Sequence, residues 1–210
     1  MTRDAKFKRI FTVIPYILIL LVMLPRLASP QFGLLDDPAT LARAQSIMQG
    51  DFDLENDLMA GRFRPLYWLF PSVIYFLAGA EPFWFYFGFL IIYLILLFEI
   101  NVYMNKRGAA AWQICLTSIL LIFSIPSIEN FYTLSKGEPL QLLFILASLI
   151  SLESLKSLSD TKKPWELVFV CFLSILCALF VKETTLVLLP ISILWLGYVF
   201  INKNPFPKRI

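Results

Sequence analysis

Long apolar runs constrain the fold of this chain more than any single motif does. An α-helix needs about 20 consecutive apolar residues to cross the hydrocarbon core of a bilayer. Hydrophobic residues make up 59% of the sequence, against about 45–50% in an average soluble domain. The sequence therefore predicts an all-α, polytopic transmembrane helical bundle that forms a single membrane domain over 1–210. The six runs of suitable length cover residues 10–27, 83–104, 109–127, 138–155, 165–181 and 184–201.

A shorter apolar stretch over residues 65–80 is marginal as a further span, because it contains Pro71. Basic residues gather in cytoplasmic loops, so their distribution can decide whether this stretch crosses. With a cytoplasmic N-terminus and no crossing at 65–80, 12 of the 18 basic residues lie inside, whereas a crossing would leave 6 inside. We therefore predict about six spans, cytoplasmic N- and C-termini, and an external loop over 28–82 that carries a short juxtamembrane helix. The six basic residues left outside are Arg26, Arg43, Arg62, Arg64, Lys136 and Lys182.

Composition also excludes several kinds of site. The chain has no histidine, so histidine bases, histidine metal ligands and Ser–His or Cys–His nucleophiles are excluded. Its three cysteines (Cys115, Cys171 and Cys177) lie in apolar runs, where cysteine acts as a small apolar residue. The net charge of +3 is small, and we expect no nucleic-acid partner. Because glycosylation and retention signals are lacking, a plasma (inner) membrane is favoured over the endoplasmic reticulum.

Residues 28–64 form the only long polar segment, and the triplet Asp36-Asp37-Pro38 within it is typical of a helix start. Asp37 fits the N-cap position and Pro38 the first helical position. The pattern over 39–49 then predicts a short amphipathic helix in the membrane interface, ended by the glycine that follows. Capping accounts for Asp37 and leaves Asp36 free to accept a proton. From these residues alone, a catalytic and a purely structural role are equally open.

Other charged residues fall on the same predicted face. Arg62 and Arg64 precede an aromatic segment, which fits either an interfacial anchor or a clamp for phosphate, whose oxygens arginine binds with paired donors. Lys182 and Glu183 separate two apolar runs. They form either a simple salt bridge or a site in which the lysine holds an anionic group. Three more charged residues, Glu129, Lys136 and Glu138, come just before the helix that Pro139 opens.

The order of these features resembles that of a known family. A basic N-terminus and one span lead to the Asp-Asp loop, and Arg-Phe-Arg-Pro-Leu-Tyr-Trp follows at 62–68. Lys-Gly-Glu-Pro follows at 136–139 and Val-Lys-Glu-Thr-Thr at 181–185. Over residues 10–201 the chain resembles the membrane glycosyltransferases of the C superfamily, especially the protein mannosyltransferase and aminoarabinose-transferase branch. The resemblance depends on the combination, because no single motif is specific.

This resemblance implies a lipid-linked-sugar-dependent, inverting glycosyltransferase. Such enzymes move a sugar from a polyprenyl-phosphate donor to a glycan, lipid or protein acceptor at the external face. The resemblance implies that Asp36 is the general base and that Asp37 is its catalytic neighbour. It assigns no metal site and requires no cofactor, although some relatives use a divalent metal, which the acids here could bind. The implied substrate-binding residues are Arg62, Arg64, Lys136, Glu138 (near the acceptor), Lys182 and Glu183.

Members of that family are usually longer, so we expect this chain to need a C-terminal portion or a partner subunit. Two alternatives remain open. One is a non-catalytic membrane subunit or carrier-lipid transporter with a degenerate site, and the other is a membrane scaffold. A transporter would place facing charges near the bilayer midplane, whereas nearly all charges here fall at one predicted face. This distribution favours a surface enzyme that works among membrane lipids.

Overall fold

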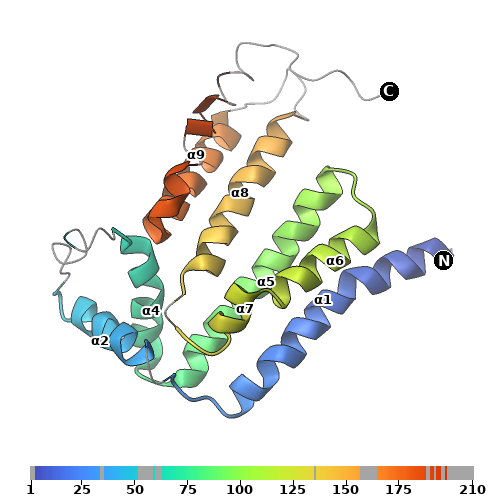
Figure 1. Ribbon diagram of the computed structural model, residues 1–210. Helices are drawn as coiled ribbons and strands as arrows, with labels where there is room; N and C mark the ends of the chain where they lie inside the picture. The colour runs from blue at the N-terminus through green and yellow to red at the C-terminus, as the bar shows by residue number, and fades with distance from the viewer. Residues whose placement is uncertain are drawn as a thin grey trace.

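The computed structural model describes residues 3–33, 36–51, 63–134, 136–156 and 165–187, together with 59, 190, 191, 193, 194 and 197. Across these residues all regular structure is helical and no strand occurs, as the all-α prediction requires (Figure 1). Arg62, which is predicted to bind substrate, lies outside the described residues, as does most of the predicted last span over 184–201. The elements are α1 (Arg3–Ala28), α2 (Asp37–Met48), α4 (Pro65–Ala78), α5 (Pro82–Lys106), α6 (Ala111–Ile122), α7 (Ile125–Asn130), α8 (Glu138–Lys156), α9 (Trp165–Val181) and the 3-10 helix η1 (Glu183–Val187).

Three of the described helices are long and apolar enough to cross a membrane. They are Phe7–Ala28 in α1, the whole of α5, and Glu138–Leu155 in α8. Each matches a predicted span within a few residues. Two further predicted spans contain the shorter apolar helices α6 and α9. The chain is therefore an all-helical protein with three candidate membrane-spanning helices in its described part.

The predicted span over 109–127 is not one continuous helix. It breaks between α6 and α7, where Ser124 takes the N-cap position and its Oγ accepts a hydrogen bond from the backbone N–H of Ser127 at 3.4 Å. Pro126 follows in the first turn of α7, where its missing N–H leaves no intrahelical bond unmade. Local capping chemistry thus starts a second helix within one apolar run.

Helix α5 lies at the centre of the bundle and packs against α1, α4, α6 and α8. Gly88 makes the close approach of α4 feasible, since a Cβ at that position would lie 2.8 Å from Ile74 Cδ1. Beside it, the rings of Phe70 and Phe89 meet edge to face, with their centroids 5.3 Å apart. The largest side chains that α5 buries are Phe85, Tyr86, Phe89, Tyr93, Leu96 and Leu97.

The short helix predicted over 39–49 is present as α2. It ends before Gly50, whose φ of +86° is in the left-handed region that favours glycine. Its buried face consists of Asp37, Thr40 and Ala44, which are spaced three and four residues apart as one face of a helix requires. This face packs on α4.

Successive long helices alternate in direction, so several of their ends meet at one end of the bundle (Figure 1). Arg26 in the last turn of α1 bonds to Tyr86 near the start of α5. Lys182, just after α9, pairs with Glu138 at the start of α8. Because α2 lies at this end as well, we call it the α2 end of the bundle.

Candidate functional site

A buried carboxylate, that of Asp37, connects three separate segments at the α2 end. Asp37 is fully buried. Its Oδ2 accepts from the backbone N–H of Gly33 at 2.6 Å and from the Tyr86 hydroxyl at 3.2 Å. Its Oδ1 accepts from the backbone N–H of Leu134 at 2.7 Å. The first loop, α5 and the segment before α8 are thus connected through one side chain.

The prediction that Asp37 caps its helix is wrong. Asp36 occupies the N-cap position instead. Its backbone has helical angles, φ −102° and ψ −25°, and its side chain makes no capping hydrogen bond. An N-cap residue normally has extended backbone geometry, from which its side chain can reach the next free N–H groups. Asp37 instead turns its carboxylate toward N–H groups outside the helix, and its side chain is fully buried.

Arg26, at the end of α1, bonds to Tyr86, which is one of the three donors to the Asp37 carboxylate. Its Nη2 donates to the Tyr86 hydroxyl at 2.6 Å and to the Tyr132 carbonyl at 3.1 Å. Its guanidinium also lies 4.4 Å from the centroid of the Tyr86 ring, within the range of a cation–π contact. Sequence reasoning counted Arg26 only for topology. Its position just after an apolar run, at the predicted membrane surface, was the signal that could have identified it.

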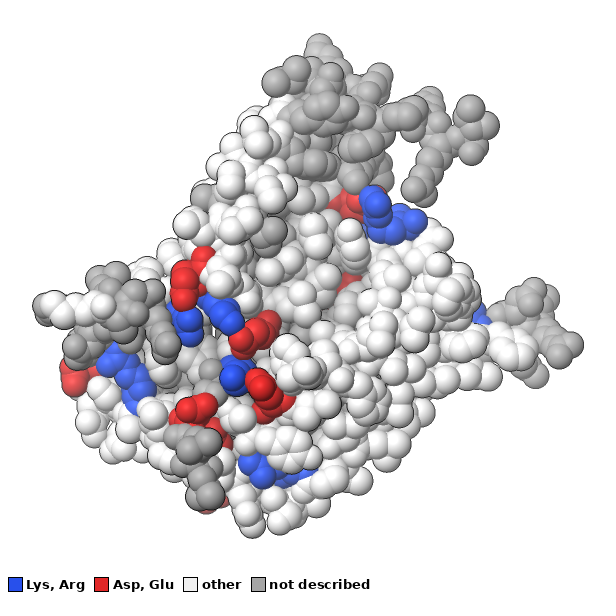
Figure 2. Space-filling view, in the orientation of Figure 1, with Lys and Arg blue, Asp and Glu red and all other residues white. Residues whose placement is uncertain are grey.

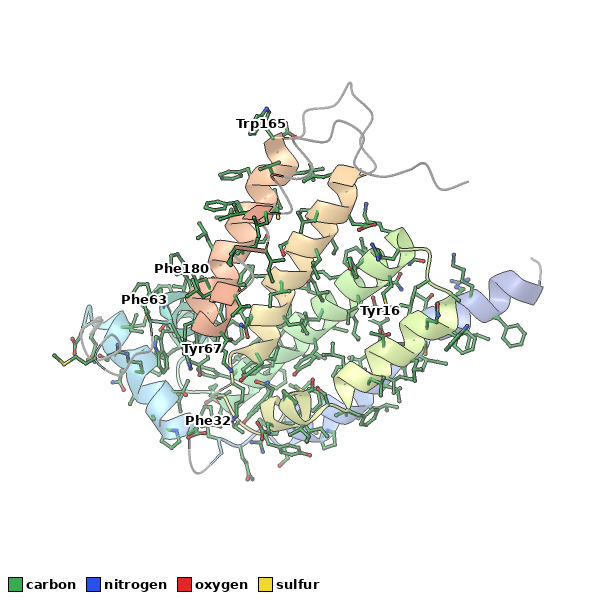
Figure 3. The ribbon with its side chains drawn as sticks, turned by 45° about the horizontal axis from the view of Figure 1, so that its top comes forward. Tyr16, Phe32, Phe63, Tyr67, Trp165 and Phe180 are labelled. Carbon is green, nitrogen blue, oxygen red and sulfur yellow. The ribbon has the colours of Figure 1, made fainter. Side chains whose placement is uncertain are left out.

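Asp36 differs from its neighbour because it is exposed. The charge of Asp36 acts on the buried side chain of Tyr67, which is labelled in Figure 3. The Tyr67 hydroxyl donates to the Leu134 carbonyl at 3.2 Å. Burial raises the pKa of Tyr67 to about 12, and the negative charges of Glu138 and Asp36 add to the rise. Tyr67 therefore stays a neutral donor at physiological pH.

Arg64, Lys182 and Lys136 each meet a carboxylate at the α2 end. Arg64 donates through Nε and Nη2 to both oxygens of Glu183, at 2.8 and 2.7 Å. Lys182 pairs with Glu138, and Lys136 with Glu129 at 3.2 Å. The Lys182–Glu183 salt bridge that the sequence left open does not form, because each partner binds a different segment. We call these six residues the charged cluster, and Figure 2 shows charged side chains gathered over this end of the molecule.

The Arg64–Glu183 pair anchors the start of α4 to the end of α9. Hydrogen bonding to Arg64 lowers the pKa of Glu183 to about 2, and Glu183 in turn raises the pKa of Arg64. Next to the pair, the rings of Phe63 and Phe180 meet edge to face with centroids 6.0 Å apart (Figure 3). Both residues of the ion pair are consequently charged at neutral pH and held in a defined geometry.

The sequence did not identify the contact that fixes η1 beside α8. Gln141 Nε2 donates to Thr185 Oγ1 at 2.6 Å and to Thr184 Oγ1 at 3.1 Å. Thr185 is buried, and its hydroxyl donates to the Ala178 carbonyl at 3.0 Å. These bonds place Lys182 and Glu183 between α8 and α4, where both reach their partners.

An apolar cavity of about 350 Å³ lies between α4, α5 and α8. Leu66 and Leu140 line it, and each stands two residues from a charged residue of the cluster, Arg64 and Glu138. The other lining residues carry aliphatic or aromatic side chains or none at all: Leu69, Phe70, Val73, Ile74, Gly88, Ile91, Ile92 and Phe144. The α2 end therefore combines a charged cluster and an apolar cavity on the same two helices.

Five of the eight predicted site residues belong to the charged cluster: Arg64, Lys136, Glu138, Lys182 and Glu183. Asp36 is exposed, Asp37 is fully buried, and Arg62 is outside the described residues. Within the described part of the chain, no three side chains among His, Cys, Asp and Glu come together as metal ligands would. The cluster carboxylates pair with cations instead. No protein-family model, no curated protein and no solved structure matches this chain.

Proposed function

We propose that the chain transfers a sugar from a polyprenyl-phosphate donor to an acceptor hydroxyl at the α2 end of the bundle. One observation carries this proposal: the apolar cavity begins within two residues of Arg64 and Glu138. A ligand that fits both parts has a long apolar chain and an anionic head. A polyprenyl phosphate has this chemistry, and arginine is the side chain best suited to bind phosphate oxygens.

In the proposed reaction, the Asp36 carboxylate takes the proton of the acceptor hydroxyl. The acceptor oxygen forms a bond to C1 of the sugar, and the bond from C1 to the phosphate oxygen breaks. The bonding electrons leave with the polyprenyl phosphate, whose added negative charge Arg64 and Lys182 stabilise. A single displacement of this kind inverts the configuration at C1. Glu138 lies beside Lys182, where it can position the acceptor.

The proposal includes an arrangement in the membrane. The start of α4 contacts Glu183 after α9, and α5 begins beside Arg26 at the end of α1. The start of α4 and the start of the next helix, α5, thus both lie at the α2 end. This supports a short α4 that returns to the same side of the membrane without crossing it. We propose about six spans, both termini cytoplasmic, and the α2 end facing outward from a plasma (inner) membrane.

One observation favours a non-catalytic lipid-binding subunit as the second candidate. The described cations of the cluster all face carboxylates, and Arg64 binds Glu183 with two donors. A phosphate would therefore have to displace or share these acids. A subunit that binds a carrier lipid needs only this exchange of carboxylates for phosphate. A transferase also needs a general base, the role we propose for Asp36.

The test uses the full chain in lipid nanodiscs. It is incubated with polyprenyl-phosphate sugars labelled in the sugar and with a membrane extract as the source of acceptors. Released polyprenyl phosphate is measured by mass spectrometry. We expect Asp36→Asn to lower release at least about 100-fold, the usual contribution of a general base, and to leave binding of polyprenyl phosphate intact.

Two matched variants sharpen this test. Asp51→Asn changes another exposed carboxylate just after α2 and should leave release unchanged. Arg64→Gln should weaken binding of polyprenyl phosphate, whereas Arg107→Gln, which breaks an ion pair with Glu153 elsewhere, should not. Full release by Asp36→Asn would refute its role as base. Binding without release in the wild-type chain would establish the non-catalytic subunit instead.

A further inference from the structure

A second cavity, of about 260 Å³, lies on the other side of α8 from the apolar cavity. Glu138, Gln141, Leu142 and Ile145 line it, whereas the apolar cavity takes Leu140 and Phe144 from the same helix. Residues spaced three, four and seven apart share one face of a helix. The first turns of α8 thus separate an apolar cavity from a mostly apolar one whose lining includes five polar side chains. Glu138, one of these five, forms the ion pair with Lys182 at the start of the helix.

The walls of this second cavity, which we call the α8 polar cavity, contain several hydroxyl groups. Ser124 and Ser127 line it from the junction of α6 and α7, and Tyr93 lines it from α5. The Ser124 hydroxyl donates to the Leu121 carbonyl at 2.8 Å, and its Oγ lies at hydrogen-bond distance, 3.0 Å, from the Ser127 hydroxyl. Pro126, at the edge of the cavity, is exposed, so the cavity has an approach from outside.

Tyr93 contributes to the α8 polar cavity a buried hydroxyl that lacks a hydrogen-bond partner among the described residues. The residue is 1% exposed. Ser127 and Asn130 are its polar neighbours, yet neither meets the geometry of a hydrogen bond, and Asn130 Oδ1 also lacks a partner within the described chain. Leaving a buried polar group unpaired costs about 1–3 kcal/mol, so a ligand in the cavity that bonds to the Tyr93 hydroxyl would be favoured.

The lining also limits the chemistry of the ligand. Glu138 is the one charged residue that lines the described cavity, and Lys182 already neutralises it. Aliphatic side chains such as Leu96 and Leu142 provide apolar surface between the hydroxyl groups. Drug-sized ligands need pockets of about 300 Å³ or more, so this occupant is smaller. It is uncharged, carries hydroxyl groups and has an apolar face.

We propose that the α8 polar cavity binds one monosaccharide ring and that the Tyr93 hydroxyl is a specificity-determining contact to it. Two sources could supply this ring: a free saccharide, or the sugar of a lipid-linked donor whose phosphate lies at Lys182. The second source depends on the proposed function, and the first does not. In the second case one donor molecule occupies all three places. Its polyprenyl chain lies in the apolar cavity, its phosphate at the charged cluster and its sugar in the α8 polar cavity.

The experiment measures binding to the full chain in lipid nanodiscs by native mass spectrometry. The probes are a polyprenyl-phosphate hexose, the same polyprenyl phosphate without sugar, and a methyl hexoside. We expect the wild-type chain to bind a sugar-bearing probe more tightly than its sugar-free counterpart. Tyr93→Phe should reduce this sugar-dependent gain about tenfold, as the loss of one buried hydrogen bond does, without changing the affinity for the sugar-free lipid. Tyr103→Phe, on the same helix and away from the cavity, is the matched control.

A second variant, Ile145→Trp, fills the cavity and should abolish the sugar-dependent gain while the sugar-free lipid still binds. If the methyl hexoside binds with this dependence on Tyr93 but no lipid binds, the cavity proposal stands and the proposed function fails. If the lipids bind equally with and without sugar, and Tyr93→Phe changes nothing, the cavity holds water only and this proposal is overturned. Sugar-dependent binding that Tyr103→Phe weakens as much as Tyr93→Phe would also overturn it.

Discussion

The two adjacent aspartates of the first loop have opposite environments, and this difference gives a prediction at the scale of single residues. Asp37 is fully buried with three donors, whereas Asp36 is exposed. Asp37→Leu would leave the N–H groups of Gly33 and Leu134 buried without an acceptor. The free energy of unfolding should fall by about 3 kcal/mol, since bonds to a charged acceptor contribute about 1.5–3 kcal/mol each.

This loss can be measured by thermal or chemical unfolding of the chain in detergent. Asp36→Asn is the matched control and should unfold like the wild type, even though it is expected to lower the release of polyprenyl phosphate at least about 100-fold. Equal destabilisation by the two substitutions would contradict the distinct roles assigned to these carboxylates.

At the scale of elements, the Arg64–Glu183 pair connects α4 to η1 and predicts a pH dependence. Glu183 has an ordinary pKa of 4.5, which hydrogen bonding to Arg64 lowers to about 2 in the folded chain. Below pH 4.5 the Glu183 carboxylate therefore takes up a proton in the unfolded chain but stays ionised in the folded chain, so acid favours unfolding. The stabilisation from this pair is complete above pH 4.5 and is lost progressively as the pH falls to about 2.

Unfolding midpoints in detergent, measured between pH 7 and pH 2.5, test this dependence. The difference in midpoint between the wild type and Glu183→Gln should be constant above pH 5 and shrink below pH 4.5. Because 40% of the Glu183 side chain is exposed, solvent screening keeps the effect small. Glu166→Gln, at an exposed position in the first turn of α9, should follow the wild type. A difference that grows in acid would contradict the pairing.

Periodicity and apolar length predicted which segments are helical, and the structure agrees for α1, α2, α5, α8 and α9. These signals are local, and so is the Ser124 cap that starts α7, which was not predicted from the sequence. The partners of the charged residues could not be predicted, because they depend on which helix ends meet in space. Asp37 fits a capping position by sequence, yet its partners lie 4 and 97 residues away. Lys182 and Glu183 are adjacent in sequence but pair with α8 and α4.

At the scale of the whole molecule, the two ends of α5 mark the two sides of the proposed membrane arrangement. Its 25 residues span about 37 Å at 1.5 Å per residue, which exceeds the roughly 30 Å hydrocarbon core. Exposed tryptophans lie near both ends of the bundle: Trp84 at the start of α5, and Trp112 and Trp165 at the starts of α6 and α9. Figure 3 labels Trp165. Tryptophan is enriched at both membrane interfaces, so this placement fits helices that cross between them.

Single cysteines at the two ends of α5 test this orientation. In a chain whose three native cysteines are replaced by alanine, Ala80→Cys should react with a membrane-impermeant maleimide in intact spheroplasts. Lys106→Cys should react only after permeabilisation, because our arrangement places it in the cytoplasm. Both positions are exposed, so burial would not explain a failure to react. The opposite labelling would invert the arrangement and place the charged cluster in the cytoplasm, since Arg64 and Glu138 lie at the same end of the bundle as the start of α5.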